Sequence, residues 1–140
     1  MTEVVQKKKL TARGAKAKGD RYERELATFF NHALGITTAQ RAPLSGGGKV
    51  GVAGGADLVG VPDLFIEAKR KEKVSFREAM RQAETNIMLS RSSDIPVVIT
   101  RSNNEPTAHS FVFLRLEDFI KFYRAYLAQE GVLHPEQGAD

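Results

Sequence analysis

The fold is decided by one segment, residues 55–69, which reads GADLVGVPDLFIEAK. It contains an acid at Asp57, a Gly/Pro turn, and an apolar run that ends in Glu67, Ala68 and Lys69. Because residues i and i+2 of a strand share a face, Glu67 and Lys69 point to the same side of the predicted strand. The turn reverses the chain, so the segment predicts a β-hairpin that brings Asp57 beside Glu67.

The two carboxylates of this hairpin are hard oxygen donors. The chain has no cysteine and only three histidines, so its ligand chemistry favours Mg²⁺, with Mn²⁺ as a substitute, over Zn²⁺. The expected ligands are Asp57, Glu67 and the backbone carbonyl of Ala68. Water on such a metal has a lowered pKa and can attack phosphorus, while Lys69 is suited to stabilising the developing charge. The structural alternative is an exposed strand face with an ordinary Glu–Lys pair.

Asp63 is an alternative to Asp57 as the first ligand, because Pro62-Asp63 also precedes the apolar run. Asp63 has the same strand parity as Glu67. It nevertheless lies some 13 Å along the strand from Glu67, at about 3.3 Å per residue. The returning strand places Asp57 closer to Glu67, and the sequence therefore favours Asp57.

Hydrophobic spacing and end signals predict the elements around the hairpin. Asp20 with Glu23 forms a capping-box pattern, so a helix is expected from Asp20 to Gly35, and Ser75 with Glu78 repeats the pattern before a second helix. Further strands are expected at 36–42, 97–100 and 111–116, and a last helix at 117–129. This order predicts an α/β fold with a central mixed β-sheet flanked by α-helices.

A chain of 140 residues with 41% hydrophobic content is expected to form one globular domain. No apolar run approaches the roughly 20 residues of a membrane span, and the N-terminus lacks the apolar core of a signal peptide. No membrane partner is therefore expected. The absence of cysteine excludes a disulfide framework and is compatible with a reducing cytoplasm, where we expect the protein to reside.

The net charge of +4 is concentrated near the N-terminus. Residues 1–49 hold ten Lys and Arg against four Asp and Glu, whereas the remainder holds eleven against thirteen. This asymmetry favours a polyanionic partner such as DNA, with a solubilising tail as the alternative. The basic residues expected to contact DNA are Lys16, Lys18, Arg21, Arg24, Arg41, Lys49, Arg70 and Lys71.

Residues 43–55 are dense in glycine and predict a loop. Arg41 before the loop and Ser45 within it offer a guanidinium and a hydroxyl for phosphate contact, although an inert loop is an equally simple interpretation. Two other residues are ambiguous. Glu23 is either a helix-capping acid or a third acid near the metal, and Gln82 is either a surface residue or a neighbour of the site.

Three segments together resemble the PD-(D/E)xK nuclease superfamily and, within it, the archaeal-type Holliday junction resolvases. The first is residues 19–26, GDRYEREL, which look like the family's opening Gly-x-x-x-Glu-Arg-Glu-Leu helix. The others are RAPLSGG at residues 41–47 and the hairpin with its DLV and IEAK strands. The compact, glycine-rich form is also similar to small phage-encoded nucleases. Three features depart from the resolvase pattern: a short Asp-to-Glu interval, a long glycine loop, and alanine between the last acid and the lysine.

The resemblance implies a restriction-endonuclease-like core, metal-dependent hydrolysis of DNA, and a role in DNA recombination and repair. It implies a homodimer that resolves four-way (Holliday) junctions by paired nicks. The acidic catalytic residues would be Glu23, Asp57 and Glu67, with Lys69 as the catalytic lysine and Ser45 as an active-site loop residue.

The expected organisation is a flexible basic arm at residues 1–18, a single nuclease domain at 19–130, and a disordered tail at 131–140. Two other functions remain open from the residues alone. One is a related nuclease of the nicking or restriction type, and the other is a DNA-binding module without catalysis.

Overall fold

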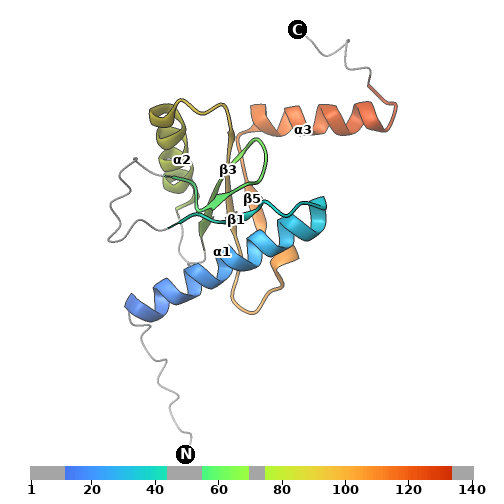
Figure 1. Ribbon diagram of the computed structural model, residues 1–140. Coiled ribbons are helices and arrows are strands. Elements are labelled where there is room, and N and C mark those ends of the chain that lie inside the picture. Colours follow the sequence, from blue (N-terminus) through green and yellow to red (C-terminus); the bar gives the residue numbers. More distant parts are fainter. Residues whose placement is uncertain (1–11, 44–54, 70–74, 134–140) are drawn as a thin grey trace, which may run out of the picture.

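The computed structural model describes residues 12–43, 55–69 and 75–133. Five strands form one mixed sheet in the order β1-β2-β3-β4-β5, and three α-helices accompany it (Figure 1). The predicted α/β fold with a central mixed sheet is confirmed. The elements are α1 (Ala12–Leu34), β1 (Gln40–Arg41), β2 (Leu58–Val59), β3 (Leu64–Lys69), α2 (Phe76–Ser90), β4 (Ile95–Thr100), a 3₁₀ turn (Thr107–His109), β5 (Phe111–Phe113) and α3 (Leu116–Gln129).

Strand β3 is the centre of the sheet. It pairs antiparallel with β2 across the hairpin turn, and parallel with β4 from Leu64↔Ile95 to Lys69↔Thr100. Parallel neighbours need a crossover, which α2 supplies. Strand β5 pairs antiparallel with β4 at the far edge.

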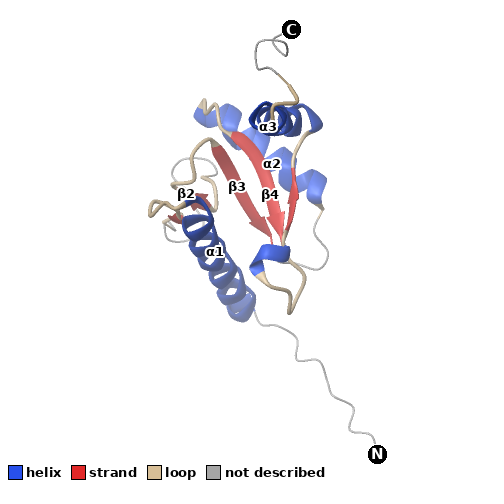
Figure 2. Cartoon of the chain, turned by 90° about the vertical axis from the view of Figure 1, so that its right-hand side faces the viewer, coloured by secondary structure: helices blue, strands red, loops and turns tan. Residues whose placement is uncertain are grey.

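The two faces of the sheet are covered by different helices (Figure 2). Ile66 faces the α1 side, where a buried cluster also contains Tyr22, Leu26, Leu58, Val97 and Ile99. The α2 side buries Val98 against Ala79 and Met80. Since side chains alternate along a strand and Glu67 is in register with Val98, Glu67 belongs to the face that carries α2.

The first helix begins earlier than the sequence predicts. Helix α1 starts at Ala12, so the predicted start at Asp20 is wrong and Asp20 and Glu23 lie inside the helix. Residues 12–18, expected in a flexible basic arm, are helical. The physical reason is their Ala, Lys and Arg content, because these residues have high helix propensity.

The strand predicted at 36–42 is present but shorter than expected, because only Gln40–Arg41 forms β1. The side-chain amide of Asn31 explains the shortening. Its Nδ2 donates to the carbonyl of Ala39 and its Oδ1 accepts from the Ala39 N–H, both at 2.9 Å. The backbone groups of Ala39 that a neighbouring strand would use are therefore already bonded.

The other predicted elements agree with the structure apart from their ends. Strand β3 matches its predicted bounds, and Ser75 Oγ accepts from the Glu78 N–H at 3.3 Å as the capping pattern requires. Strand β4 starts earlier and β5 ends earlier than expected. None of the helices within the described ranges is long and apolar enough to cross a membrane.

Candidate active site

The β2–β3 hairpin brings Asp57 beside the end of β3. Asp57 immediately precedes β2, and its backbone N–H donates to the carbonyl of Ile66 at 2.8 Å. Its side chain is fixed as well, because the backbone N–H of Ala68 donates to Asp57 Oδ2 at 2.8 Å. Both hydrogen bonds follow from the register Leu58↔Ile66, so the hairpin itself positions this carboxylate.

Glu67 and Lys69 complete the group. Glu67 is only 4% exposed, and its Oε2 lies 3.7 Å from Lys69 Nζ. The side chain of Lys69 remains one-third exposed, so a phosphate can approach its ammonium from solvent. The structure thus brings together three residues that the sequence singles out, Asp57, Glu67 and Lys69.

The buried Glu67 and the half-buried Asp57 share this site at an electrostatic cost. Burial and the nearby charge of Asp57 raise the pKa of Glu67 from 4.5 to about 8. Burial also raises the pKa of Asp57, while the Ala68 N–H and the charge of Lys69 act in the opposite direction. Both shifts show that negative charge is poorly compensated here, which is the condition that a divalent cation would relieve.

The donor set fits a hard cation. Mg²⁺ is held in proteins by one or two carboxylates and otherwise keeps waters or phosphate oxygens as ligands. Asp57 and Glu67 would supply the carboxylates, and the Ala68 carbonyl stays a predicted third ligand. In the described part of the chain, no three His, Asp or Glu side chains gather closely enough to form a metal cage of their own.

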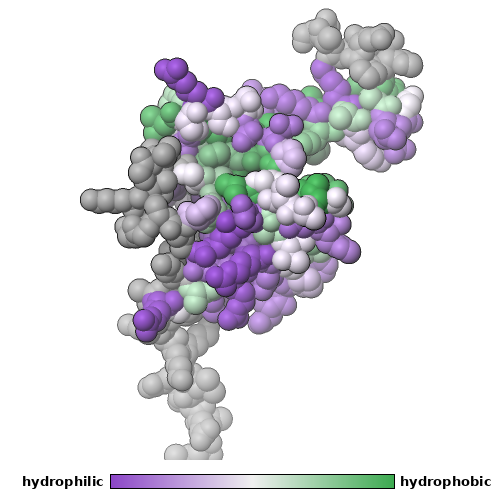
Figure 3. Space-filling model, in the orientation of Figure 1, coloured by the Kyte–Doolittle hydropathy of each residue, from purple (hydrophilic) through white to green (hydrophobic). Residues whose placement is uncertain are grey.

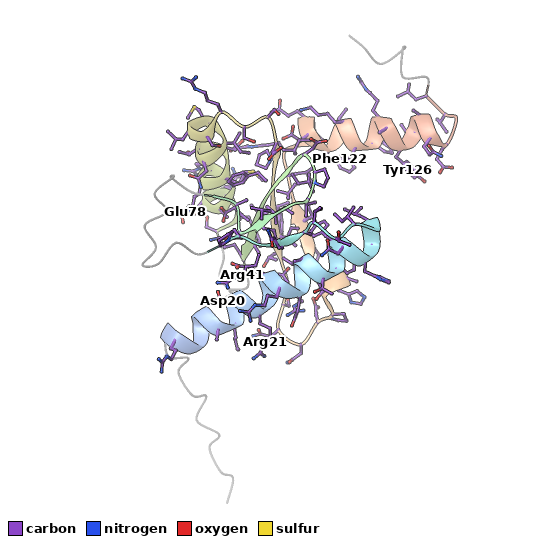
Figure 4. All side chains as sticks on the ribbon, viewed as in Figure 1. Asp20, Arg21, Arg41, Glu78, Phe122 and Tyr126 are labelled. Carbon is purple, nitrogen blue, oxygen red and sulfur yellow. The ribbon has the colours of Figure 1, made fainter. Side chains whose placement is uncertain are left out.

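Glu23 lies in a neighbouring ion-pair cluster. Its Oε2 is 2.9 Å from Arg41 Nε, and Arg41 Nη2 is 2.7 Å from Asp20 Oδ1 (Figure 4). Burial and the charge of Asp57 raise the pKa of Glu23, although Arg41 opposes this. Glu23 therefore interacts electrostatically with Asp57, and its role as a metal ligand stays a prediction.

The cluster also changes the interpretation of Arg41. Its guanidinium is largely buried and bridges the side chains of two acids. The sequence predicted only contact with DNA for this residue, and such contact does not require a buried bridge. Asp20 was missed as a site residue by the sequence, which gave it a capping role. The available signal was its position one helical turn before Glu23, since residues i and i+3 share a helix face.

Other basic residues of α1 line its outer surface. Arg21 and Arg24 are exposed and, with His32, line a shallow hollow of about 520 Å³. Figure 4 shows Arg21 pointing away from the sheet. Lys18 is half-buried, and contact of these residues with DNA stays a prediction.

Several predicted site residues lie outside the described residues. They are Ser45, Lys49, Arg70 and Lys71, together with the side chain of Lys16. Asp63 is described, and it lies in the hairpin turn with a positive φ of 63°. Its carbonyl accepts from the Ile95 N–H at 2.8 Å, a link to the start of β4 at the opposite end of β3 from Lys69. Gln82 is exposed on α2.

Comparison with known proteins gives one match. A family model described as "Phage putative PDDEXK endonuclease" matches residues 14–130. No curated protein and no solved structure matches the chain. The matched range contains the whole sheet and all three residues of the acid–acid–lysine group.

Proposed function

We propose, from the premise that this chain belongs to the phage putative PDDEXK endonuclease family, that Asp57, Glu67 and Lys69 form its catalytic centre. The family is one of metal-dependent nucleases, and the five-stranded mixed sheet with three helices is consistent with a restriction-endonuclease-like core. One observation carries the proposal. Two acids with raised pKa values lie at the end of a central strand, with a partly exposed lysine on the same face.

Each residue of the centre has a distinct task in phosphodiester hydrolysis. Asp57 and Glu67 would hold the divalent metal, which supplies a water of lowered pKa and Lewis-acid stabilisation when bound. The Ala68 N–H keeps Asp57 oriented. The ammonium of Lys69 is available to orient the attacking water and to stabilise charge that develops on the scissile phosphate.

We assign four-way DNA junctions as the substrate and a homodimer as the active form. The resemblance to archaeal-type junction resolvases supports this choice, as does the basic excess of the first third of the chain. Two symmetric nicks need two centres, which a two-fold dimer supplies. Mg²⁺ is the expected metal, and Mn²⁺ is expected to replace it.

The experiment uses the full chain with Mg²⁺, a synthetic four-way junction and a linear duplex of matched sequence. Paired nicks in the junction alone are expected, and chelation with EDTA should abolish them. Cleavage of both substrates at equal rates would refute junction selectivity and favour the nicking or restriction-type alternative. Absence of cleavage with either metal would favour a DNA-binding module.

The residue assignment needs variants that separate binding from chemistry. Asp57→Asn and Lys69→Ala should each lower the cleavage rate by at least about 100-fold while junction binding is retained. Asp63→Asn is the matched control, because it removes an acid of the same hairpin, and asparagine tolerates its positive φ. Full activity in Asp57→Asn with loss in Asp63→Asn would reverse the assignment.

A further inference from the structure

Helix α3 turns its apolar side to solvent. Phe119, Phe122, Tyr123 and Tyr126 are between 44% and 59% exposed, and Leu116 is 73% exposed. These positions share one side of a helix with 3.6 residues per turn. Figure 4 shows Phe122 and Tyr126 on the same side of α3, and Figure 3 shows α3 standing apart from the body of the protein.

Helix α3 buries an acid, whereas its aromatic rings stay exposed. In this helix, all of which is described, Asp118 is the buried residue, and it lies one turn before Phe122, at the border of the aromatic side. A helix that buries an acid and exposes aromatic rings is not oriented by apolar burial within its own chain. The rest of the sequence has little to cover it with, because the residues outside the described ranges include no Phe, Tyr or Trp.

A complementary hollow lies between α2 and β5. Phe76 and Phe113 line it with stacked rings, whose centroids are 3.9 Å apart, and its volume is about 280 Å³. Arg77, Arg81 and Arg115 line it as well. The hollow therefore combines aromatic surface with basic side chains, next to the exposed Phe111 of the edge strand.

The chain's own α3 is directed away from this hollow. Arg115, which precedes α3, is bound in bidentate fashion by Glu84 of α2, at 2.9 and 3.2 Å. This pair fixes the point at which α3 leaves the body, and Figure 1 shows the helix extending outward from the end of β5. The apolar side of α3 and the hollow between α2 and β5 therefore lie on the same chain, but the helix does not fill the hollow.

Helix α3 has no basic excess. Glu117 and Asp118 stand against Lys121 and Arg124, and Lys121 pairs with Asp118 at 3.1 Å. Such a helix does not fit an anionic membrane surface or a DNA backbone, both of which select for basic helices.

The exposed aromatic area is a substantial part of what an interface needs. An aromatic side chain buries about 150–250 Å² when it is fully enclosed. The rings of α3 and Phe111 are about half exposed, so they offer on the order of several hundred Å² per copy, against the ~800 Å² per partner of a standard interface. Exposed Phe and Tyr are also the residue types enriched at the centres of protein interfaces.

We infer that two copies of this chain exchange α3, each helix packing its apolar side into the hollow between α2 and β5 of the other copy. Both complementary surfaces lie on one chain, which is what selects a second copy as the occupant. A two-fold exchange fills both hollows and leaves no open end. The inference deepens the homodimer of the proposed function and rests on that proposal for the need of two centres.

The first test is the mass of the full chain in solution, measured by light scattering after size exclusion. The wild-type protein should have twice the 15.4 kDa mass of one chain, and Phe119→Glu with Tyr126→Glu should give a monomer with unchanged circular dichroism. Arg124→Glu is the matched control, since it places an acid on the exposed side of α3 that faces away from the aromatic residues, and this variant should stay dimeric. A monomeric wild-type chain, or a double variant that remains dimeric, would overturn the inference.

The second test locates the contact by cross-linking. The chain has no natural cysteine, so only the introduced cysteines can react. A chain carrying both Phe76→Cys and Phe122→Cys should form a covalent dimer with a bis-maleimide, while each single variant should not. Cross-linking of the Phe122→Cys chain alone would indicate α3 packing on α3 and would overturn the exchange.

Neither measurement needs metal or DNA, so failure of the nuclease proposal and failure of the exchange are distinguishable. Dimers without any DNA cleavage would refute only the proposed chemistry. Cleavage by a chain that is monomeric would refute only the exchange.

Discussion

The backbone N–H of Ala68 donates a 2.8 Å hydrogen bond to Oδ2 of Asp57. This amide lies between Glu67 and Lys69 in the chain, so the strand that carries two members of the acid–acid–lysine group also orients the third. A backbone donor cannot rotate away as a side chain can. The separation of the two carboxylates is therefore set by the register of the hairpin.

Metal binding should depend on both acids of the hairpin. Mg²⁺ at about 100 times its Kd should stabilise the wild-type protein by ~2.7 kcal/mol, which is several degrees in Tm. Asp57→Asn and Glu67→Gln should lose this shift, because each removes one of two carboxylate ligands. Differential scanning fluorimetry with and without Mg²⁺ measures it, and an unchanged shift in either variant would contradict the ligand assignment.

The stability of the metal-free protein should fall as the pH rises through the range of Glu67. Its pKa is raised from 4.5 to about 8 in the folded state, so the folded protein binds a proton that the unfolded chain has already released. The free energy of unfolding therefore decreases between about pH 5 and pH 8, and Asp57 acts in the same direction. Thermal melts in EDTA across this range measure the decrease.

Glu67→Gln provides the control for that titration. Glutamine has no proton to bind or release, so the variant should lose less stability than the wild type over the same pH range. At about pH 8.5 the difference between the two should be on the order of 1–3 kcal/mol in favour of the variant. Parallel curves for both proteins would show that another group dominates.

Loss of Arg41 should destabilise the fold. Arg41→Ala leaves Glu23 and Asp20 without their shared cation, and because all three side chains are at least three-quarters buried the cost should be about 2–4 kcal/mol. Arg41→Lys should lose part of this, since one ammonium cannot reproduce the two-pronged contact. Urea unfolding measures both, and Lys121→Ala, which removes an exposed ammonium paired with Asp118, should cost less than ~1 kcal/mol.

The turn of the hairpin should not tolerate a side chain at Gly60. Its φ is +81°, and a Cβ would overlap the backbone of Thr38, so Gly60→Ala should cost more than about 2 kcal/mol and disturb the turn that carries Asp57. Gly35→Ala is the matched control, because Gly35 also has a positive φ but open space around it, and only the strain of roughly 1 kcal/mol applies. Chemical denaturation measures the free energy of unfolding of both variants. Equal losses in Gly60→Ala and Gly35→Ala would show that the positive φ alone explains the destabilisation.

The hairpin was predictable because its signals are local. Alternation along Leu64–Lys69 and the Gly/Pro turn specify both the strand and the side to which Glu67 points, and the structure confirms this strand at both ends. The preference for Asp57 over Asp63 was also a local geometric argument. The structure places Asp57 against Ala68, and leaves Asp63 in the turn.

The failures of the sequence analysis lie where a distant residue decides. Asp20 and Glu23 have the spacing of a capping box, but the same spacing places two acids on one helix face, and only the fold shows that Arg41 bridges them. The strand expected at 36–42 is shortened by the amide of Asn31. The sequence predicts the last helix, yet periodicity cannot reveal what packs against it.

A hydrogen bond between two residues that are far apart in the chain has a consequence for biosynthesis. Tyr22 Oη donates to Ser110 Oγ at 2.8 Å, linking α1 to the segment directly before β5 across 88 positions of sequence. The cluster around Tyr22 likewise includes Val97 and Ile99 of β4. Helix α1 leaves the ribosome before these later residues and cannot complete its docking until they emerge. The nascent chain therefore acquires the support beneath its acid-bearing hairpin only after Ser110 has been synthesised, so a product that terminates before this residue lacks an assembled centre.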